Sequence, residues 1–281
     1  MIELVADRYG KAAIRLVRVA RGPDGDTLRD LTVAIALEGD FAAAHTDGDN
    51  TNVIATDTMK NTAYAFAKSH LDGPLEAYGR ALADHFLAAP QVDVATVNIK
   101  GHHWQHIAVG GQPAPDAFVR GGEGTRVATI TGTHAGTTVE AGVEDVVVMK
   151  TTRSAFRGFP RDTYTTLAET DDRLMATKVT AIWRYGSPDL DFDAVFAAVR
   201  TTLLEVFADH ESPSVQTSIW VMGKAILDRH DEVEQVRMVL PNLHHWLVDL
   251  RPFGLENDRE IYTPTTEPHG LIEATVRRTE A

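Results

Sequence analysis

Apolar and polar residues alternate along two stretches near the start of the chain, the pattern of half-buried β-strands. The first stretch runs from Ile14 to Val19, and the second runs from Leu28 to Leu37. Between them, Gly22-Pro23-Asp24-Gly25 has the composition of a tight turn. The pattern therefore predicts an antiparallel hairpin.

Two helices are predicted to follow this hairpin. At Thr56-Asp57-Thr58 an Ala-rich helix begins and continues toward His70, with one of the last two of these three residues as its N-cap. Pro74 fits the first turn of a second helix, which ends near Leu87. Strands are expected after it at residues 92–99, 118–119, 127–131 and 139–149.

The second half of the chain repeats this order. A strand is expected over residues 174–185, and apolar residues at helical spacing predict an amphipathic helix over residues 191–209. Another helix follows Ser212-Pro213, and the remaining strands are expected at residues 236–240, 244–250 and 271–276. The repetition predicts an α+β protein of two related domains, residues 1–136 and 137–281. Each is expected to be an antiparallel sheet with one face covered by two helices.

Composition narrows the chemistry. The chain of 281 residues has no cysteine, which excludes disulfides, thiolate zinc sites, iron–sulfur clusters and a cysteine nucleophile. Its 27 Lys and Arg against 40 Asp and Glu give a net charge of −13, which disfavours nucleic acid and anionic membranes as partners. Charged residues occur too early in the N-terminal segment for the apolar stretch of a signal peptide, and no apolar run approaches membrane-spanning length. We expect a cytoplasmic protein that binds small molecules or other subunits.

The histidines are the first candidates for a site. His102 and His106 have the spacing of a helical metal pair, but Gly101 argues against a helix there and no carboxylate ligand is placed beside them. We therefore expect no metal. His244-His245 begins a predicted strand, so the two imidazoles point to opposite faces. One could lie in the core and the other in a site, and the periodicity does not show which. P-loop, Rossmann and nucleophile-elbow motifs are absent.

Several short segments, taken in order, resemble the urate oxidase family. They extend from residue 9 to residue 276, so the resemblance covers nearly the whole chain. The segments are Tyr9-Gly10-Lys11, Ala55-Thr56-Asp57-Thr58 with Lys60-Asn61-Thr62, Phe156-Arg157-Gly158-Phe159-Pro160-Arg161-Asp162 with Tyr164-Thr165-Thr166-Leu167, Asp172-Arg173, Ser212-Pro213-Ser214-Val215-Gln216, Leu240-Pro241-Asn242 with His244, and Gly270-Leu271-Ile272-Glu273-Ala274-Thr275.

The resemblance implies the tunnelling fold (T-fold). Each half is then an antiparallel four-stranded sheet with two helices on its outer face. Subunits close their sheets into a barrel, and two such rings stack into a homotetramer. Full closure would remove the exposed sheet edges that a single antiparallel sheet leaves.

The resemblance also implies a urate pocket shared by two subunits. Urate is a planar anion, which suits an arginine fork on one edge, a glutamine amide on the other and an aromatic stacking face. A helix start on the other subunit offers backbone N–H groups to an anion. One subunit would supply Phe156, Arg173, Val215, Gln216, Asn242 and His244, and its neighbour would supply Lys11, Thr56 and Asp57.

The implied reaction needs no metal and no organic cofactor: urate, O₂ and water give 5-hydroxyisourate and hydrogen peroxide. Lys11, Thr56 and His244 would form a proton relay, in which Lys11 at a subunit interface takes a proton from urate through Thr56. The resulting electron-rich dianion can pass an electron to O₂. Asn242 would help to hold O₂ and later the attacking water.

Two alternatives stay open. A metal-dependent pterin or purine enzyme of the same fold would need a convergent histidine cluster or a cysteine ligand, and a glutamate in place of Gln216. A purine-binding protein without catalysis would keep Phe156, Arg173 and Gln216 but lose the relay. The chain also departs from the family pattern at Trp104-Gln105-His106, where an aromatic residue and an arginine are expected, and the stretch up to residue 120 has the character of a loop. Leu243 stands where a lysine is common, on the strand face opposite to Asn242 and His244.

Overall fold

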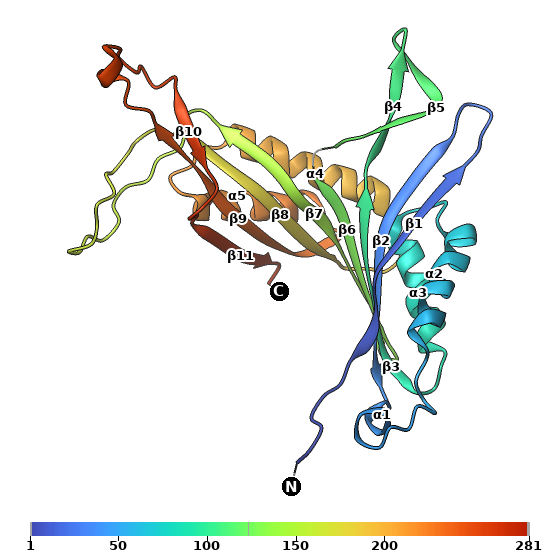
Figure 1. The fold of residues 1–281 in the computed structure, drawn as a ribbon. Coiled ribbons are helices and arrows are strands. Elements are labelled where there is room, and N and C mark those ends of the chain that lie inside the picture. The colour runs from blue at the N-terminus through green and yellow to red at the C-terminus, as the bar shows by residue number, and fades with distance from the viewer. Residues whose placement is uncertain (1, 123, 280–281) are drawn as a thin grey trace. The chain divides into compact units, whose positions relative to one another are not determined.

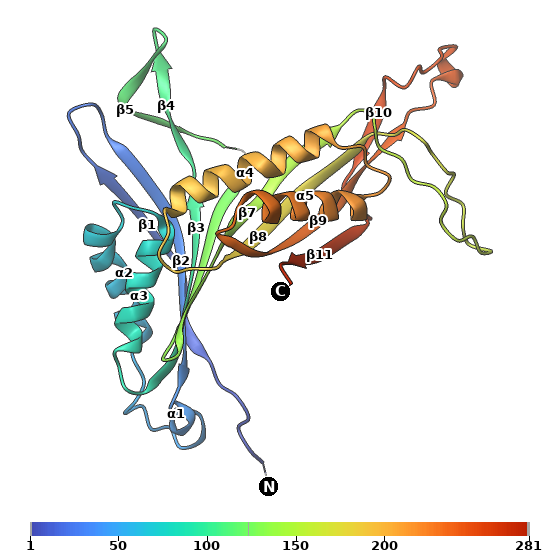
Figure 2. The same ribbon diagram turned by 180° about the vertical axis from the view of Figure 1, so that it is seen from behind.

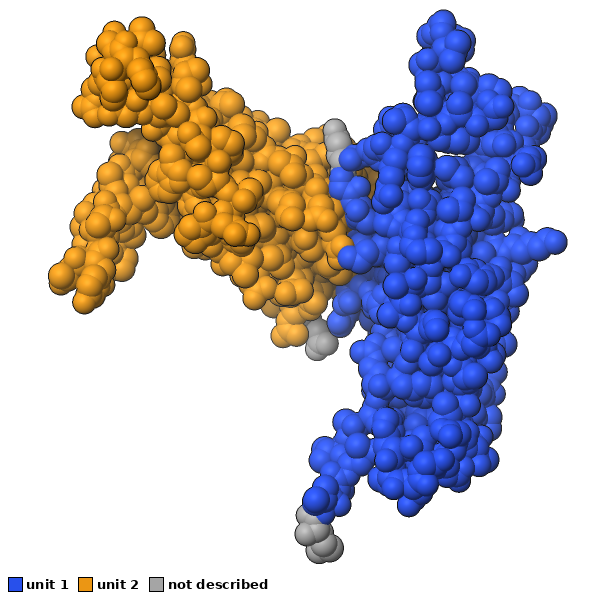
Figure 3. Space-filling model, in the orientation of Figure 1, with its two compact units in different colours: residues 1–142, 184–194 blue, residues 143–183, 195–281 orange. Residues whose placement is uncertain are grey.

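The computed structural model describes residues 2–122 and 124–279. The chain forms two compact units: unit 1 comprises residues 1–142 and 184–194, and unit 2 comprises residues 143–183 and 195–281 (Figure 3). Two strands, β7 (Gly136–Lys150) and β8 (Met175–Tyr185), contribute residues to both units. The α+β class with antiparallel pairing is confirmed, and the domain boundary at residue 136 stays a prediction.

Unit 1 is built on the strand order β1-β2-β3-β6, in which each pair is antiparallel. The predicted hairpin is present as β1 (Tyr9–Ala20) and β2 (Thr27–Gly39), followed by a short α1 (Ala42–Thr46) that the sequence analysis missed. The helices α2 (Thr56–His70) and α3 (Leu75–Leu87) cover one face of the sheet (Figure 1). Of the two, α3 packs against the strands β3 (Val92–His102) and β6 (Thr125–Thr133), and α2 packs against β1.

Close packing holds α3 against this sheet. Tyr78, Leu82 and Phe86 recur every four residues along one face of α3, and all three are buried. A Cβ atom at Gly79 would lie 2.4 Å from Cδ1 of Ile130 on β6, so only glycine permits this approach without displacement. The helical spacing of apolar residues therefore becomes the core of unit 1.

The predicted N-cap of α2 was wrong. Ala55 occupies the N-cap position without a side-chain hydrogen bond, and Thr56 and Asp57 lie in the first turn. The carboxylate of Asp57 bonds instead to Lys60, and it accepts from Asn61 Nδ2 at 2.9 Å, both one turn further along the same helix. Pro74 is the N-cap of α3, one position before the predicted first turn.

The stretch around residue 110 is a β-hairpin, so the predicted loop was also wrong. Strands β4 (Trp104–Val109) and β5 (Gln112–Arg120) pair antiparallel as a separate two-stranded sheet. Gly110 and Gly111 form its turn with φ of 60° and 82°, the conformation that suits the twist of a two-residue hairpin. Most residues of the hairpin are exposed, so its sequence lacks the alternation of apolar and polar residues by which a half-buried strand is predicted.

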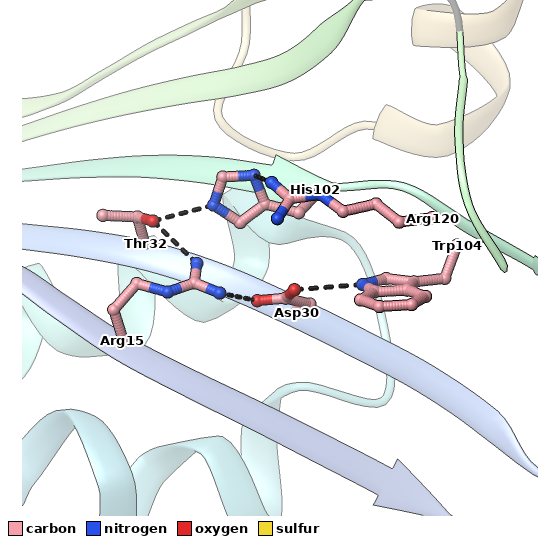
Figure 4. A network of polar contacts seen from close by, with 6 residues as sticks. All are labelled: Arg15, Asp30, Thr32, His102, Trp104 and Arg120. Atoms are coloured by element: carbon pink, nitrogen blue, oxygen red, sulfur yellow. Dashed lines mark hydrogen bonds and ion pairs between the residues drawn. The ribbon is translucent and has the colours of Figure 1, made fainter. Parts of the chain in front are cut away.

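A polar network joins this hairpin to the main sheet of unit 1 (Figure 4). Trp104 Nε1 donates to the buried Asp30 at 3.0 Å, and Asp30 also pairs with Arg15. Arg120 Nη2 donates to His102 Nδ1 at 2.9 Å, which leaves His102 Nε2 to donate to Thr32 Oγ1 at 2.8 Å. The network fixes the base of the hairpin on β2 and β3.

Unit 2 is built on β7, β8 and β9 (Val233–Leu247), with α4 (Phe192–Asp209) and α5 (Val215–Arg229) on one face (Figure 2). Two strands pair antiparallel with β9, β11 (Leu271–Arg277) along its first part and β10 (Tyr262–Thr265) along its last part. A 3₁₀ turn, η1 (Arg251–Phe253), precedes β10.

The two strands predicted at residues 236–240 and 244–250 are one strand, β9. Pro241 lies within it, close to the point where the pairing partner changes from β11 to β10. A proline, which has no N–H group, is tolerated where a ladder is interrupted in this way. None of the helices that the structure describes is long and apolar enough to cross a membrane.

Candidate active site

Six of the candidate site residues lie in unit 2, on three separate segments. These segments are the connection between β7 and β8, the first turn of α5 and the second half of β9. In chain order they carry Phe156 and Arg173, then Val215 and Gln216, then Asn242 and His244.

Backbone pairing in the connection from β7 to β8 places Arg173 over Phe156. Phe156 N donates to Thr170 O at 2.8 Å, Thr170 N donates back to Phe156 O at 3.1 Å, and Arg173 N donates to Ser154 O at 2.8 Å. The guanidinium carbon of Arg173 then lies 5.3 Å from the centre of the Phe156 ring. Phe159 stacks on Phe156 with a centroid distance of 5.0 Å and an interplanar angle of 14°.

The guanidinium of Arg173 has unused donor capacity. Its Nε is buried and has no hydrogen-bond partner within the part of the chain that the structure describes. Burial lowers the pKa of Arg173, because a charged group loses hydration there. A half-buried cation with a free N–H is stabilised by an anion that accepts hydrogen bonds, and a planar anion would also meet the Phe156 ring.

The first turn of α5 contributes a second group of donors. Ser214 is the N-cap, and its Oγ accepts from Thr217 N at 3.2 Å. Val215 is buried, so its side chain is part of the apolar packing, and Gln216 is exposed, so its amide is accessible to solvent. Backbone N–H groups in the first turn have no partner inside the helix, which makes this position suitable for an anion.

On β9, Asn242 and His244 lie on the same strand face. Asn242 Nδ2 is 3.5 Å from His244 Nδ1, and the His244 ring stacks on Trp246 at 5.4 Å. Burial lowers the pKa of His244, and the positive charge of Arg173 lowers it further. The tertiary structure therefore brings His244 and Arg173 into one electrostatic environment and favours a neutral imidazole. The side chain of His245 is engaged elsewhere, with Nδ1 2.9 Å from Leu243 O.

The other three candidates, Lys11, Thr56 and Asp57, lie in unit 1. Lys11 is half-buried on β1, opposite Ile35 and next to a bulge. Hydrogen bonding to Lys60 is the main cause of the lowered pKa of Asp57, and the charge of Lys11 adds to it. β1, which carries Lys11, contacts α2, and the half-buried Thr56 lies at the start of the first turn of that helix.

Two neighbours of the site were missed by the sequence analysis. His269 lies in the segment between β10 and β11, and its electrostatic interaction with His244 contributes to the lowered pKa of His244. Asn242 N donates to Gly270 O at 2.8 Å, which holds this segment against β9. No spacing in the sequence indicates this pairing across strands. Phe159, which stacks on the Phe156 ring, lies within a segment that carries the family resemblance, but the sequence does not show that these two rings are in contact.

The His102 and His106 pair does not converge with other ligands. His102 is on β3 and His106 is on β4, where its Nδ1 is 2.6 Å from Ala114 O. Among the described residues there is no group of three or more His, Cys, Asp or Glu side chains that could hold a metal ion.

Comparison with known proteins identifies the family on both halves of the chain. The family model described as Uricase matches residues 7–131 and 139–273. The Uricase of Arthrobacter globiformis is 42% identical over 278 residues, which are 99% of this chain and 90% of that protein. The Uricase of Dictyostelium discoideum is 37% identical over 285 residues, 100% of this chain and 99% of that protein. The crystal structure of uricase from Arthrobacter globiformis, 42% identical, has a TM-score of 0.94 and covers 100% of this chain and 96% of that one.

Proposed function

The chain belongs to the uricase family, and we propose that the nine candidate residues form its urate site. It is an oxidoreductase that oxidises urate. The observation that carries the site assignment is the guanidinium of Arg173, which lies over the Phe156 ring with a buried N–H that has no partner among the described residues. A planar anion with acceptors on its edge satisfies both features.

In the proposed complex, urate lies against the Phe156 ring with one edge toward Arg173. The guanidinium donates two parallel hydrogen bonds to the urate monoanion, which fixes its orientation as well as its affinity. The amide of Gln216 and the backbone N–H of Val215 bond to the opposite edge, at the start of α5. Arg173, Val215 and Gln216 therefore determine binding.

Proton transfer is assigned to Lys11, Thr56 and His244. In this step the neutral amine form of Lys11 accepts a proton from the urate monoanion through the Thr56 hydroxyl and becomes an ammonium ion, and the urate dianion that results is a far better electron donor to O₂. The neutral His244, favoured by burial and by Arg173, completes the relay. Asn242, 3.5 Å from His244, holds O₂ and then the water that attacks the oxidised ring. The overall products are 5-hydroxyisourate and hydrogen peroxide, and the protein supplies no metal or organic cofactor.

We further propose that the site is completed by assembly. In the proposed T-fold homotetramer, sheets of neighbouring subunits close into a barrel, and Lys11, Thr56 and Asp57 of one subunit meet the Arg173 group of its neighbour. Support comes from the strand β1, which carries Lys11 and which, among the strands that the structure describes, pairs with β2 alone and so forms an edge of the sheet. Closure would cover this edge.

The test is to add urate to metal-free protein and to follow its ultraviolet absorbance together with oxygen consumption. We expect the urate band to disappear, with one O₂ consumed for each urate, and no effect of further chelation. Turnover that is lost on chelation and restored by one metal would favour the metal-dependent enzyme. Urate binding without loss of the band would favour the purine-binding protein. Arg173→Ala serves as the inactive control.

A further inference from the structure

A hydrogen-bond network of two hydroxyls and one imidazole lies beneath the first turn of α5. Ser212 is 1% exposed, Ser218 is 0% exposed and His210 is half-buried. The two serine Oγ atoms are 2.8 Å apart, and Ser218 Oγ is 2.8 Å from His210 Nε2. None of these residues is part of the urate site proposed above.

The partners of His210 determine the direction of its two hydrogen bonds. His210 Nδ1 lies 2.7 Å from Val206 O, a carbonyl that can only accept, so Nδ1 carries a proton. Burial lowers the pKa of His210 and favours the neutral ring, in which Nε2 is then an acceptor for the Ser218 hydroxyl. Ser218 Oγ can then accept from the Ser212 hydroxyl, which also lies 3.1 Å from a second acceptor, Ser214 O. Each of the three side chains in this network has a hydrogen-bond partner, so the network is rigid.

Ser212 connects this network to two segments of the urate site. Ser212 N donates to Arg153 O at 2.9 Å, and Ala155 N donates to Ser212 O at 2.8 Å, immediately before Phe156. Ser154 O, between them, accepts from Arg173 N. On the other side, Ser214 caps the helix turn that carries Val215 and Gln216, and Ser218 belongs to the following turn.

We propose that His210, Ser212 and Ser218 are positioning residues for urate binding, and that they hold the Phe156 and Arg173 segment in register with the first turn of α5. The inference rests on the proposed function, because it concerns the same pocket. It assigns these residues to affinity and orientation rather than to proton transfer, since Lys11, Thr56 and His244 lie on other elements.

Two substitutions at His210 separate its two hydrogen bonds. His210→Asn keeps a donor near Nδ1 for Val206 and loses the bond to Ser218, whereas His210→Gln keeps an acceptor near Nε2 for Ser218. We expect His210→Asn and Ser218→Ala to raise both KM and the anaerobic Kd for urate about tenfold, with little change in kcat. A tenfold rise in Kd corresponds to a loss of ~1.4 kcal/mol in binding free energy. His210→Gln is expected to stay near the wild-type affinity.

The control is a similar pair outside the proposed network. Thr202 Oγ1 lies 2.8 Å from His230 Nε2, and Thr202 is 4% exposed. Thr202→Val is therefore expected to lower the melting temperature without changing the Kd for urate. Equal Kd values for His210→Asn and His210→Gln, or an unchanged Kd for Ser218→Ala, would overturn the positioning role. A wild type that binds urate without oxidising it would refute the proposed activity, while the anaerobic Kd values still decide the positioning role.

Discussion

The hydroxyl of Tyr9 forms two hydrogen bonds with the backbone of Ile54, accepting from its N–H at 2.8 Å and donating to its C=O at 3.2 Å. Tyr9 lies two positions before Lys11 on β1, and Ile54 lies two positions before Thr56 at the start of α2. One side chain therefore aligns the two segments that carry the proposed proton relay. The Tyr9 ring also packs edge-on against Phe41 at 4.7 Å.

Tyr9→Phe is expected to lower both stability and turnover. The substitution keeps the ring but leaves the N–H and C=O of Ile54 without this partner, at a cost of about 1–3 kcal/mol in the free energy of unfolding. The fall in kcat is expected to exceed the change in KM, because Lys11 and Thr56 of the proposed relay lie close to Tyr9, whereas Arg173, Val215 and Gln216, which hold the two edges of urate, lie on other elements. Denaturant unfolding and steady-state kinetics measure the two effects. Tyr64→Phe on the exposed face of α2 is the control and should change neither quantity.

Arg173→Lys is expected mainly to weaken urate binding. A lysine replaces a planar fork by a single charge, so two directed hydrogen bonds become at most one, at a cost of about 1.5–3 kcal/mol. This predicts a rise in KM of about 10- to 150-fold. Arg157→Lys is the matched control, because Arg157 is exposed and pairs with Asp171 at the surface. Equal KM values for the two variants would remove Arg173 from the pocket.

A mixing experiment tests whether the site is shared between subunits. Lys11→Ala and Arg173→Ala are each expected to be inactive alone, because each removes one half of the proposed site. Hetero-oligomers made by refolding the two together should recover part of the wild-type activity, through sites with an intact Lys11 from one chain and an intact Arg173 from the other. Verified mixed assembly without recovered activity would mean that each site is built within one chain.

Stability is expected to fall as the pH is lowered from about 7 to about 5. Burial lowers the pKa of His102, His210, His230 and His244 below the ordinary value of 6.5. In this range the unfolded chain therefore binds more protons than the folded chain, so acidification favours unfolding. The loss of stability begins as the pH falls to the ordinary histidine pKa, and it is complete below the pKa values of these histidines in the folded protein. Melting temperatures measured across this range check the prediction, and a smaller slope is expected for His230→Gln.

The sequence by itself determined the order of most helices and strands, because apolar spacing and turn composition are local properties. The hairpin through Gly22-Pro23-Asp24-Gly25 and the helix beginning at Thr56 are both present at the predicted positions. The hairpin at residues 104–120 and the continuity of β9 could not be predicted in this way. Exposure hides the first pattern, and a change of pairing partner explains why Pro241 does not end the second.

The site residues were named from the family resemblance, since composition alone favoured ordinary roles for Phe156, Arg173 and Lys11. Only the tertiary structure decided their surroundings. The Arg173 guanidinium lies over Phe156 because backbone bonds to Ser154 and Thr170 fold the connection from β7 to β8 back on itself. The lowered pKa of His244 likewise depends on burial and on Arg173, 71 positions away in the numbering. Such effects arise from contacts between distant segments, and neither periodicity nor spacing along a chain records them.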